Sequence, residues 1–238
     1  MQKNRSKERK NKLILKVISR LFFGMGVMLL LYPLFTFLYS SYEQHRLEEE
    51  LTQKLTFGDN YQGKKNYPII KLPVNNKDRE KENGKQDNEQ KNKVKKQMSQ
   101  ALEPGDAWGI IEITKIGLSA VVVSGTQPSQ LKKGPGWYPA SSLPDKTGNV
   151  AIAGHRSTYG AWFRHLDQLK KGDQIFLFYK NKRFNYQVEN VFSVEKDDFS
   201  VIKPTNYPVL TLTACHPAGS ARERLVVRAK KEEIQDLN

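Results

Sequence analysis

The segments Gln174-Ile-Phe-Leu-Phe-Tyr179 and Phe184-Asn-Tyr-Gln-Val-Glu-Asn-Val-Phe192 are rich in aromatic and β-branched residues, and the turn-forming pair Asn181-Lys182 separates them. Segments of this length and composition indicate β-strands. Five other segments have the same character: 108–114, 118–124, 149–153, 207–213 and 224–229. Only two short stretches, 129–133 and 161–169, have a helical pattern. The C-terminal part of the chain is therefore predicted to be one all-β domain, a barrel or a sandwich of seven or eight strands.

The positive charge of the chain is concentrated near its N-terminus. The 238 residues include 39 Lys and Arg against 25 Asp and Glu, which gives a net charge of +14. Residues 1–20 hold +7 of this charge, residues 21–103 hold +2, and residues 104–238 hold +5. A nucleic-acid-binding domain would carry its excess on the folded part. We therefore predict no nucleic-acid partner.

An uncharged segment of 22 residues, 21–42, follows the basic N-terminus. A helix of that length reaches about 33 Å, enough to cross a hydrocarbon core of about 30 Å. A secretory signal peptide is the main alternative, but its apolar region is only about 7 to 15 residues long. We expect a transmembrane anchor at 21–42, with residues 1–20 in the cytoplasm and the remainder outside the cell.

Residues 43–103 have the composition of a stalk. Between Val74 and Val94 there is no aliphatic or aromatic side chain, and charges of both signs alternate. Such a stretch cannot bury enough apolar surface to offset its conformational entropy. We predict a largely disordered, polar tether between the anchor and a catalytic domain at 104–238.

Cys215 is the only cysteine, so neither an intrachain disulfide nor a zinc site with two or more thiolates can form within the chain. It ends the apolar strand segment 209–215, next to a loop of small residues. A buried, structural cysteine is the usual interpretation of a lone thiol. A free thiol outside the cell is an oxidation liability, however, and Cys215 is therefore also a candidate nucleophile.

A cysteine nucleophile needs a partner, since only a few per cent of a free thiol is ionised at neutral pH. Of the four histidines, His45 falls in the predicted stalk and His165 in a short helical stretch. His216 adjoins Cys215, but neighbouring residues of a strand point to opposite faces. His155 stands at a strand end, as Cys215 does, and is the predicted partner.

A developing oxyanion also needs a positive or hydrogen-bonding group. Arg224 opens the strand after Cys215, and a hairpin would place the two side by side. Arg222, in the intervening loop, is the alternative, while Arg228 would lie on the same face but further along the strand.

Three elements resemble sortase motifs and occur in the same order. Ala153-Gly-His155-Arg-Ser157 is similar to the family's histidine motif, Leu210-Thr-Leu-Thr-Ala-Cys215 to its Thr-Leu-x-Thr-Cys strand, and Arg224-Leu-Val-Val227 to its downstream arginine. The resemblance covers roughly residues 104–232. The residue before Cys215 is Ala214, where the family usually has Thr. Segments 134–139, 155–163 and 166–173 are most similar to class E, with class D or a class A housekeeping type as alternatives.

The resemblance implies a closed β-barrel with one or two short helices and the activity of a cysteine transpeptidase. Cys215 would be the nucleophile, His155 the general acid and then base, and Arg224 the ligand of the substrate and oxyanion. Four residues of these motifs are candidate substrate contacts: Thr213, Ala214, Ser157 and Tyr159. Asp197-Asp198 is a weak candidate for calcium and more typical of a solvated turn, so we predict no metal and no other cofactor.

Such enzymes cut a sorting signal of the Leu-Ala-x-Thr-Gly or Leu-Pro-x-Thr-Gly type between Thr and Gly. They then join the Thr to an amine of the cell wall or its precursor. The implied partners are surface proteins that carry the signal, a cell-wall amine and the membrane. Two alternatives stay open: a tethered, non-enzymatic domain that binds anionic wall polymers, and a cysteine peptidase that only hydrolyses.

Overall fold

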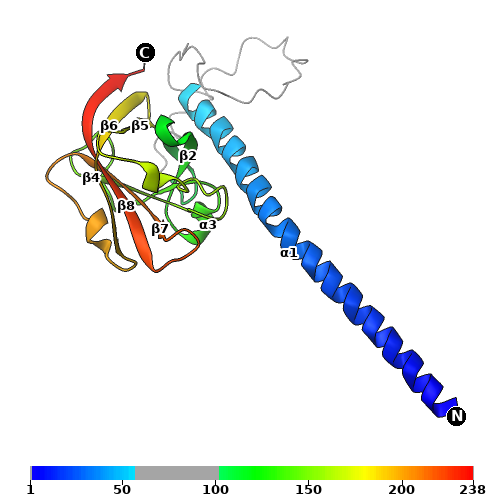
Figure 1. Cartoon of the computed structure of the whole chain (residues 1–238). Coiled ribbons are helices and arrows are strands. Elements are labelled where there is room, and N and C mark those ends of the chain that lie inside the picture. The colour runs from blue at the N-terminus through cyan, green and yellow to red at the C-terminus, as the bar shows by residue number, and fades with distance from the viewer. Residues whose placement is uncertain (1, 57–101, 238) are drawn as a thin grey trace, which may run out of the picture.

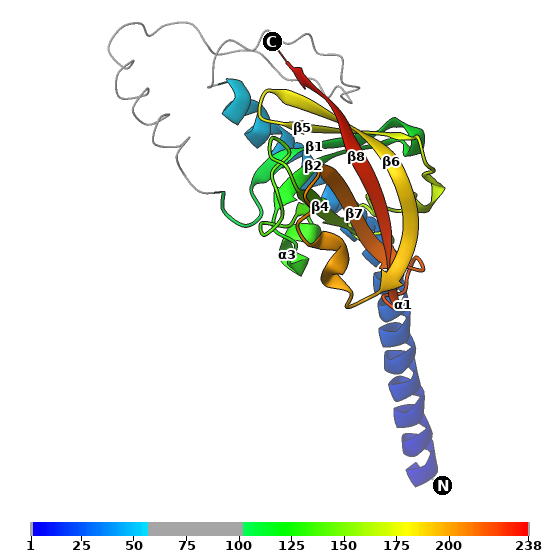
Figure 2. The same cartoon turned by 90° about the vertical axis from the view of Figure 1, so that its left-hand side faces the viewer.

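The computed structural model describes residues 2–56 and 102–237, which form one long helix and one β-barrel (Figure 1). Helix α1, Gln2–Thr56, leaves the barrel as an extended rod, and its C-terminal part lies against the barrel wall (Figures 1 and 2). Residues 57–101, which hold most of the predicted stalk, lie outside the described residues.

Eight strands close the barrel in the order β1-β2-β3-β4-β7-β8-β6-β5. Their bounds are Ala107–Ile113, Leu118–Ser124, Gly136–Trp137, Asn149–Gly154, Gln174–Tyr179, Lys182–Glu195, Val209–His216 and Glu223–Asp236, numbered β1 to β8 along the chain. Most neighbours are antiparallel, but β2 pairs with β3, and β4 with β7, in parallel. The prediction of a closed barrel of seven or eight strands is confirmed.

The inside of the barrel is a single apolar core, because the inward-facing positions of successive strands alternate with outward-facing ones. Its largest fully buried side chains are aromatic or branched, among them Tyr186, Phe163 and Phe184. Burial raises the pKa of the Tyr186 hydroxyl strongly. Burial of these apolar strand side chains is the main stabilising contribution to the domain.

The connections contain one short α-helix, α3 at Pro128–Leu131, and three 3₁₀ turns, η1 at Thr114–Ile116, η2 at Leu166–Gln168 and η3 at Phe199–Ile202. Helix α3 falls on the predicted helical stretch 129–133. The other predicted stretch, 161–169, contains only η2, and its residues Phe163 and Leu166 are buried in the core.

Helix α1 contains an apolar segment, within Leu15–Gln53, that is long and apolar enough to cross a membrane. The helix does not stop where the predicted anchor ends at residue 42. Residues 43–56 continue as helix, although they were predicted to belong to a polar, largely disordered stalk. The reason is packing: Leu47 is fully buried in a cluster with Ala107, Val121 and Val123 on the outside of β1 and β2.

Gln44 completes the edge of strand β2. Strand β3 pairs only with the last residues of β2, which leaves the N–H and C=O of Val121 without a strand partner. The amide of Gln44 takes that place: Oε1 accepts from the Val121 N–H at 2.7 Å, and Nε2 donates to the Val121 carbonyl at 3.0 Å. Nε2 also donates to the Lys133 carbonyl at 2.8 Å. A side chain at Gly134 would collide with this amide, so that glycine is needed for the contact.

Candidate active site

Cys215 and Arg224 lie side by side because β7 and β8 form an antiparallel pair in which these two residues are opposite each other. The Arg224 Nη1 atom is 3.8 Å from the Cys215 Sγ atom. Both side chains are half-buried, so the thiol is held against a guanidinium and still open to solvent. The guanidinium is thus in a position to donate to the sulfur.

Arg224 is fixed by the backbone around it. Its Nη1 also donates to the carbonyls of Ala221 and Glu223, at 3.4 and 3.2 Å. The other two candidate arginines lie elsewhere. Arg222 is exposed in the loop, and Arg228 donates to the Val201 carbonyl at 2.7 Å, four residues further along β8. Of the three arginines, the structure brings only Arg224 to the thiol.

His155 comes to the same end of the barrel through the parallel pair of β4 and β7. Gly154 is opposite Ala214 in that pair, so His155 and Cys215 are the next residues along the two chains. The ring of His155 lies beside that of Tyr159, with the ring centroids 5.6 Å apart. The parallel pair therefore brings the backbones of His155 and Cys215 to the same end of the barrel. That the imidazole acts on the thiol stays a prediction.

His155 is half-buried, and its burial lowers the pKa of the imidazole below its ordinary value. The charge of Lys132, whose Nζ lies 5.3 Å from the centroid of the Tyr159 ring, lowers that pKa further. Both effects favour the neutral ring at neutral pH. A neutral imidazole can accept a proton and then return it, which suits a general base that becomes a general acid.

A second contact joins the two strand ends on their other face. The Arg156 Nη1 atom is 3.0 Å from Nδ1 of His216, so the residues that follow His155 and Cys215 are linked as well. Arg156 is only 4% exposed, and its Nη2 contacts Asp167 at 2.9 Å and the Arg164 carbonyl at 3.2 Å. His216 thus faces Arg156, in agreement with the expectation that it points away from the thiol's face.

Arg156 was not among the predicted site residues. The available signal was positional: an arginine directly follows the candidate histidine, and a histidine directly follows the candidate cysteine. In a parallel pair, residues that lie equally far along the two strands are neighbours. The pairing of β4 with β7 was not predicted, and without it the two positions had no reason to meet.

The remaining histidines lie away from the thiol. The Nε2 atom of His45 lies 3.6 Å from a carboxylate oxygen of Glu49 on helix α1. His165 is exposed, and its Nδ1 is 3.1 Å from the Gln168 side-chain nitrogen.

The four candidate substrate contacts fall into two groups. Ser157 and Tyr159 are accessible in the loop that follows His155. Thr213 lies on the face of β7 that carries Cys215 but is only 5% exposed. Ala214 is 3% exposed and belongs to the core inside the barrel. The strand turns the Ala214 side chain away from the thiol, and the assignment of these four residues to substrate binding stays a prediction.

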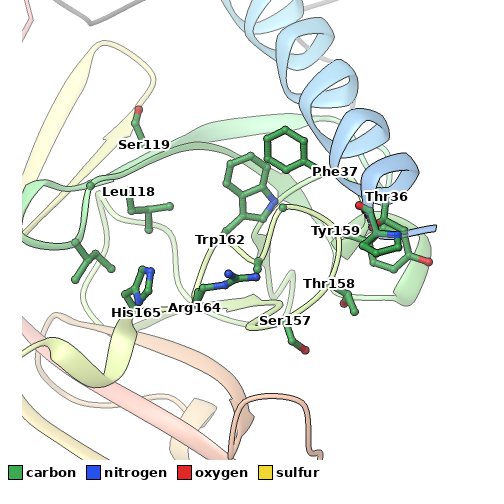
Figure 3. A pocket seen from close by; sticks show the side chains of 15 residues that line it. Thr36, Phe37, Leu118, Ser119, Ser157, Thr158, Tyr159, Trp162, Arg164 and His165 are labelled. Carbon is green, nitrogen blue, oxygen red and sulfur yellow. Dashed lines mark hydrogen bonds between the residues drawn. The ribbon is translucent and has the colours of Figure 1, made fainter. Parts of the chain in front are cut away.

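A pocket of about 430 Å³ lies beside the loop 157–165 (Figure 3). Ser157, Tyr159 and Trp162 line it on the barrel side, and Thr36 and Phe37 of helix α1 line it on the other. Cys215 does not line this pocket. The pocket lies where helix α1 meets the loop that follows His155.

Asp198, one of the two residues considered for calcium, has a local structural role. Its carboxylate accepts a hydrogen bond of 2.9 Å from the Ser200 N–H at the start of η3. Hydrogen bonding by Ser200 lowers the pKa of this carboxyl group. Within residues 2–56 and 102–237, no three His, Cys, Asp or Glu side chains are grouped so that they could hold a metal ion.

Comparison with known proteins points to one family. The family model described as "Sortase domain" matches residues 111–232. The chain is 38% identical to Sortase D of Bacillus subtilis over 133 residues, which are 54% of this chain and 66% of that protein. It is 30% identical to Sortase SrtE1 of Streptomyces coelicolor over 149 residues, 56% of this chain and 42% of that one. The chain thus spans less than two thirds of the length of these relatives.

Solved structures agree with the sequence matches. A Sortase D5 transpeptidase of Clostridium perfringens superposes with a TM-score of 0.54 at 28% identity, covering 60% of this chain and 89% of that one. Sortase E1 from Streptomyces coelicolor, with a tripeptide in the active site, gives a TM-score of 0.53 at 25% identity, with coverage of 57% and 94%. Relatives of class D and of class E are both found, with the higher identity to Sortase D.

The matched segment, 111–232, contains Cys215, His155 and Arg224 as well as the strands that position them. The chain belongs to the sortase family.

Proposed function

We propose that this protein is a membrane-anchored cysteine transpeptidase with Cys215 as nucleophile, His155 as general base and acid, and Arg224 as oxyanion ligand. The observation that carries the proposal is the Cys215–Arg224 contact of 3.8 Å at the strand end next to His155. A thiol that is half-buried and faces a guanidinium differs from a packed core cysteine. This geometry argues against a purely structural role for Cys215.

In the first step, the Cys215 sulfur attacks the carbonyl carbon of the Thr in the substrate, and neutral His155 takes the thiol proton. The carbonyl oxygen becomes negative and is stabilised by Arg224. The carbon–nitrogen bond to the following Gly breaks, and His155 gives its proton to the departing amine. A thioester between Cys215 and the Thr remains.

In the second step, an amine attacks the thioester carbon and loses a proton to the neutral His155 ring. The carbon–sulfur bond breaks, the proton passes to the sulfur, and the Thr is joined to the amine. Each atom and charge returns to its starting place on the enzyme. If water replaces the amine, the same residues give hydrolysis, which is the outcome of the peptidase alternative.

The proposed substrate carries a Leu-Ala-x-Thr-Gly or Leu-Pro-x-Thr-Gly sorting signal, and the proposed acceptor is an amine of the cell wall or its precursor. A sortase C of Clostridium perfringens has been solved with the C-terminal cell wall sorting motif, and the family membership extends that expectation to this chain. The apolar segment of α1 supports a membrane anchor. The basic residues 1–20 support an N-terminus in the cytoplasm and a barrel outside the cell.

The test uses peptides that contain either motif, with and without an amine acceptor, and mass spectrometry of the products. The wild type should release the Gly-containing fragment and, with the amine present, form the joined product. Cys215→Ala should release nothing. Turnover by the Cys215→Ala variant would refute the mechanism, while a hydrolysed product alone, even with abundant amine, would favour the peptidase. The ratio of rates on the Ala and Pro motifs then assigns the preferred signal.

A further inference from the structure

Helix α1 contacts the barrel at two levels. The lower level is the pocket beside the loop 157–165, where Thr36 and Phe37 line the helix side (Figure 3). The upper level is the edge of β2, where Gln44 and Leu47 are bound. At 1.5 Å per residue, Phe37 and Leu47 are about 15 Å apart along the helix axis. Contacts at two separated levels fix both the height of the barrel and its tilt along the helix.

The side-chain contacts between these levels are specific. Ser40 is fully buried, and a β-carbon added at Gly160 would come within 2.7 Å of its hydroxyl oxygen. Gln44 makes three hydrogen bonds to the barrel backbone, and Leu47 is fully buried. Such contacts depend on one rotation of the helix, so α1 presents one defined face to the barrel.

The catalytic end of the barrel is the end that lies toward the N-terminal half of α1. The loop 157–165 starts two residues after His155 and forms one wall of the lower contact. In both views, the turn between β7 and β8 lies toward the side where the helix leaves the barrel, whereas the C-terminus lies at the opposite end (Figures 1 and 2). The orientation of the helix therefore sets the direction in which Cys215 faces.

The lower contact coincides with the expected outer boundary of the membrane. From Leu15 to Phe35 the large apolar side chains are exposed around the helix, as Phe23 and Leu30 are at 75% and 79%. These 21 residues span about 32 Å, close to the thickness of a hydrocarbon core. We place the span here, earlier than the predicted 21–42, because Thr36, Phe37 and Ser40 already contact or face the barrel. Lys16 and Arg20, near the inner end, can extend their long side chains toward the headgroups. The outer surface then falls near Phe35, at the level of the loop that follows His155.

We propose that residues 40–51 of α1 are a docking segment that holds the catalytic end of the barrel toward the outer membrane surface. The enzyme would then select substrate segments that leave the membrane close to that surface. In this arrangement, the docked helix determines the distance of the active site from the membrane surface. The length of the 57–101 connection does not affect that distance. The inference rests on the proposed function and adds a restriction on where its substrate must lie.

The test places the full chain in liposomes together with peptides that carry the sorting motif, a Gly/Ser spacer and an apolar membrane helix. Spacers of about 3, 8 and 15 residues put the cleaved bond up to about 10, 30 and 50 Å from the membrane. A soluble peptide with the same motif serves as reference. The wild type should cleave a peptide with one of the two shorter spacers about tenfold faster than the peptide with the 15-residue spacer. Only a short spacer confines the motif near the active site.

Two insertions of the same Gly/Ser hexapeptide separate the docked helix from the alternative of a tether. Insertion between Leu38 and Tyr39 keeps residues 40–51 on the barrel but uncouples them from the membrane helix, and it should abolish the preference for a short spacer. The same insertion between Asn83 and Gly84 should leave the preference unchanged. Leu47→Asp places a carboxylate in the apolar cluster and should likewise abolish the preference for a short spacer. Gln53→Asp, at an exposed position of the same helix, is its control.

Cleavage of the soluble peptide reports on the activity itself, independently of the distance from the membrane. A preference that survives insertion after Leu38, or that shifts with insertion after Asn83, overturns the docking inference while the proposed function stands. Equal rates on all membrane-bound peptides by the wild type, with normal cleavage of the soluble one, overturn it as well. Loss of cleavage on every peptide by the wild type refutes the proposed function itself, and the docking inference falls with it.

Discussion

The catalytic strand ends and the docked part of helix α1 are both precise, but their precision has different origins. At the strand ends, backbone pairing places Cys215 opposite Arg224 and carries His155 alongside. At the helix, single side chains do the work, chiefly the Gln44 amide on the edge of β2 and Leu47 in its apolar cluster. Strand pairing thus positions Cys215, Arg224 and His155. A few side chains position the barrel on helix α1. Substitutions in the two regions should consequently affect different properties.

The largest effect is expected from Arg224→Lys, which should lower kcat/KM on a sorting peptide about 10² to 10³-fold with little change in stability. A lysine keeps the charge but loses the fixed, planar donor group. Arg222→Lys is the matched control two residues away, exposed in the loop before β8, and should change the rate by no more than about twofold. The reverse order of effects would show that the β7–β8 register places the wrong arginine at the thiol.

Side-chain contacts of Arg156 also stabilise the strand ends, and Arg156→Met tests how much. This change removes the donor to His216 and to the Arg164 carbonyl, and the free energy of unfolding should fall by about 2 kcal/mol. The half-exposed Asp167 remains solvated and adds little. Thermal unfolding of Arg156→Met, compared with Arg164→Met at an exposed position, measures the effect. Equal stability of the two variants would mean that the backbone ladder alone holds the strand ends.

For the docked helix the comparison reverses, because stability should change and catalysis on a soluble peptide should not. Gln44→Ala leaves the N–H and C=O of Val121 without their partner, at a cost of about 1 to 2 kcal/mol in the free energy of unfolding. Gln53→Ala, exposed on the same helix, is the control. A large loss of kcat on the soluble peptide by Gln44→Ala would contradict the separation of the two regions.

The smallest expected effect concerns the charge near His155. Lys132→Ala should raise the pKa of His155 toward its ordinary value but not reach it, because burial, the larger cause, remains. An NMR titration of the imidazole measures this, with Lys115→Ala as control. Since the folded state resists protonation of His155, the free energy of unfolding should also fall as the pH drops below about 6.5. A His155 pKa at or above its ordinary value would remove the basis for a neutral ring at neutral pH.

The barrel could be predicted because its strands are short, aromatic and β-branched, and because a closed sheet is their usual arrangement. The Cys215–Arg224 contact could be predicted because it follows from one hairpin between residues nine positions apart. The Arg156–His216 contact could not, since it requires the pairing of β4 with β7, which are separated by about sixty residues. Long-range pairing leaves no periodic signal in a single sequence.

The docked helix was missed for a related reason. The sequence around Gln44 and Leu47 is charged on most sides, and a run such as Glu48-Glu49-Glu50 is typical of a solvated segment. Gln44 finds its partners where β3 leaves the edge of β2 open, and Leu47 becomes buried against the outer side chains of β1 and β2. A partner that exists only after the barrel has closed cannot be recognised from local composition. The same limit applies to Ala214, whose direction depends on which face of β7 turns inward.

The amide of Gln44 has a practical consequence for any fragment that begins after the helix. Without residues 40–51, the backbone of Val121 would present an open donor and acceptor at the edge of a strand, beside the apolar patch that Leu47 normally covers. Unpaired strand edges of this kind recruit other chains. A barrel produced alone should therefore self-associate through β2, and its solubility would depend on concentration in a way that the intact chain avoids.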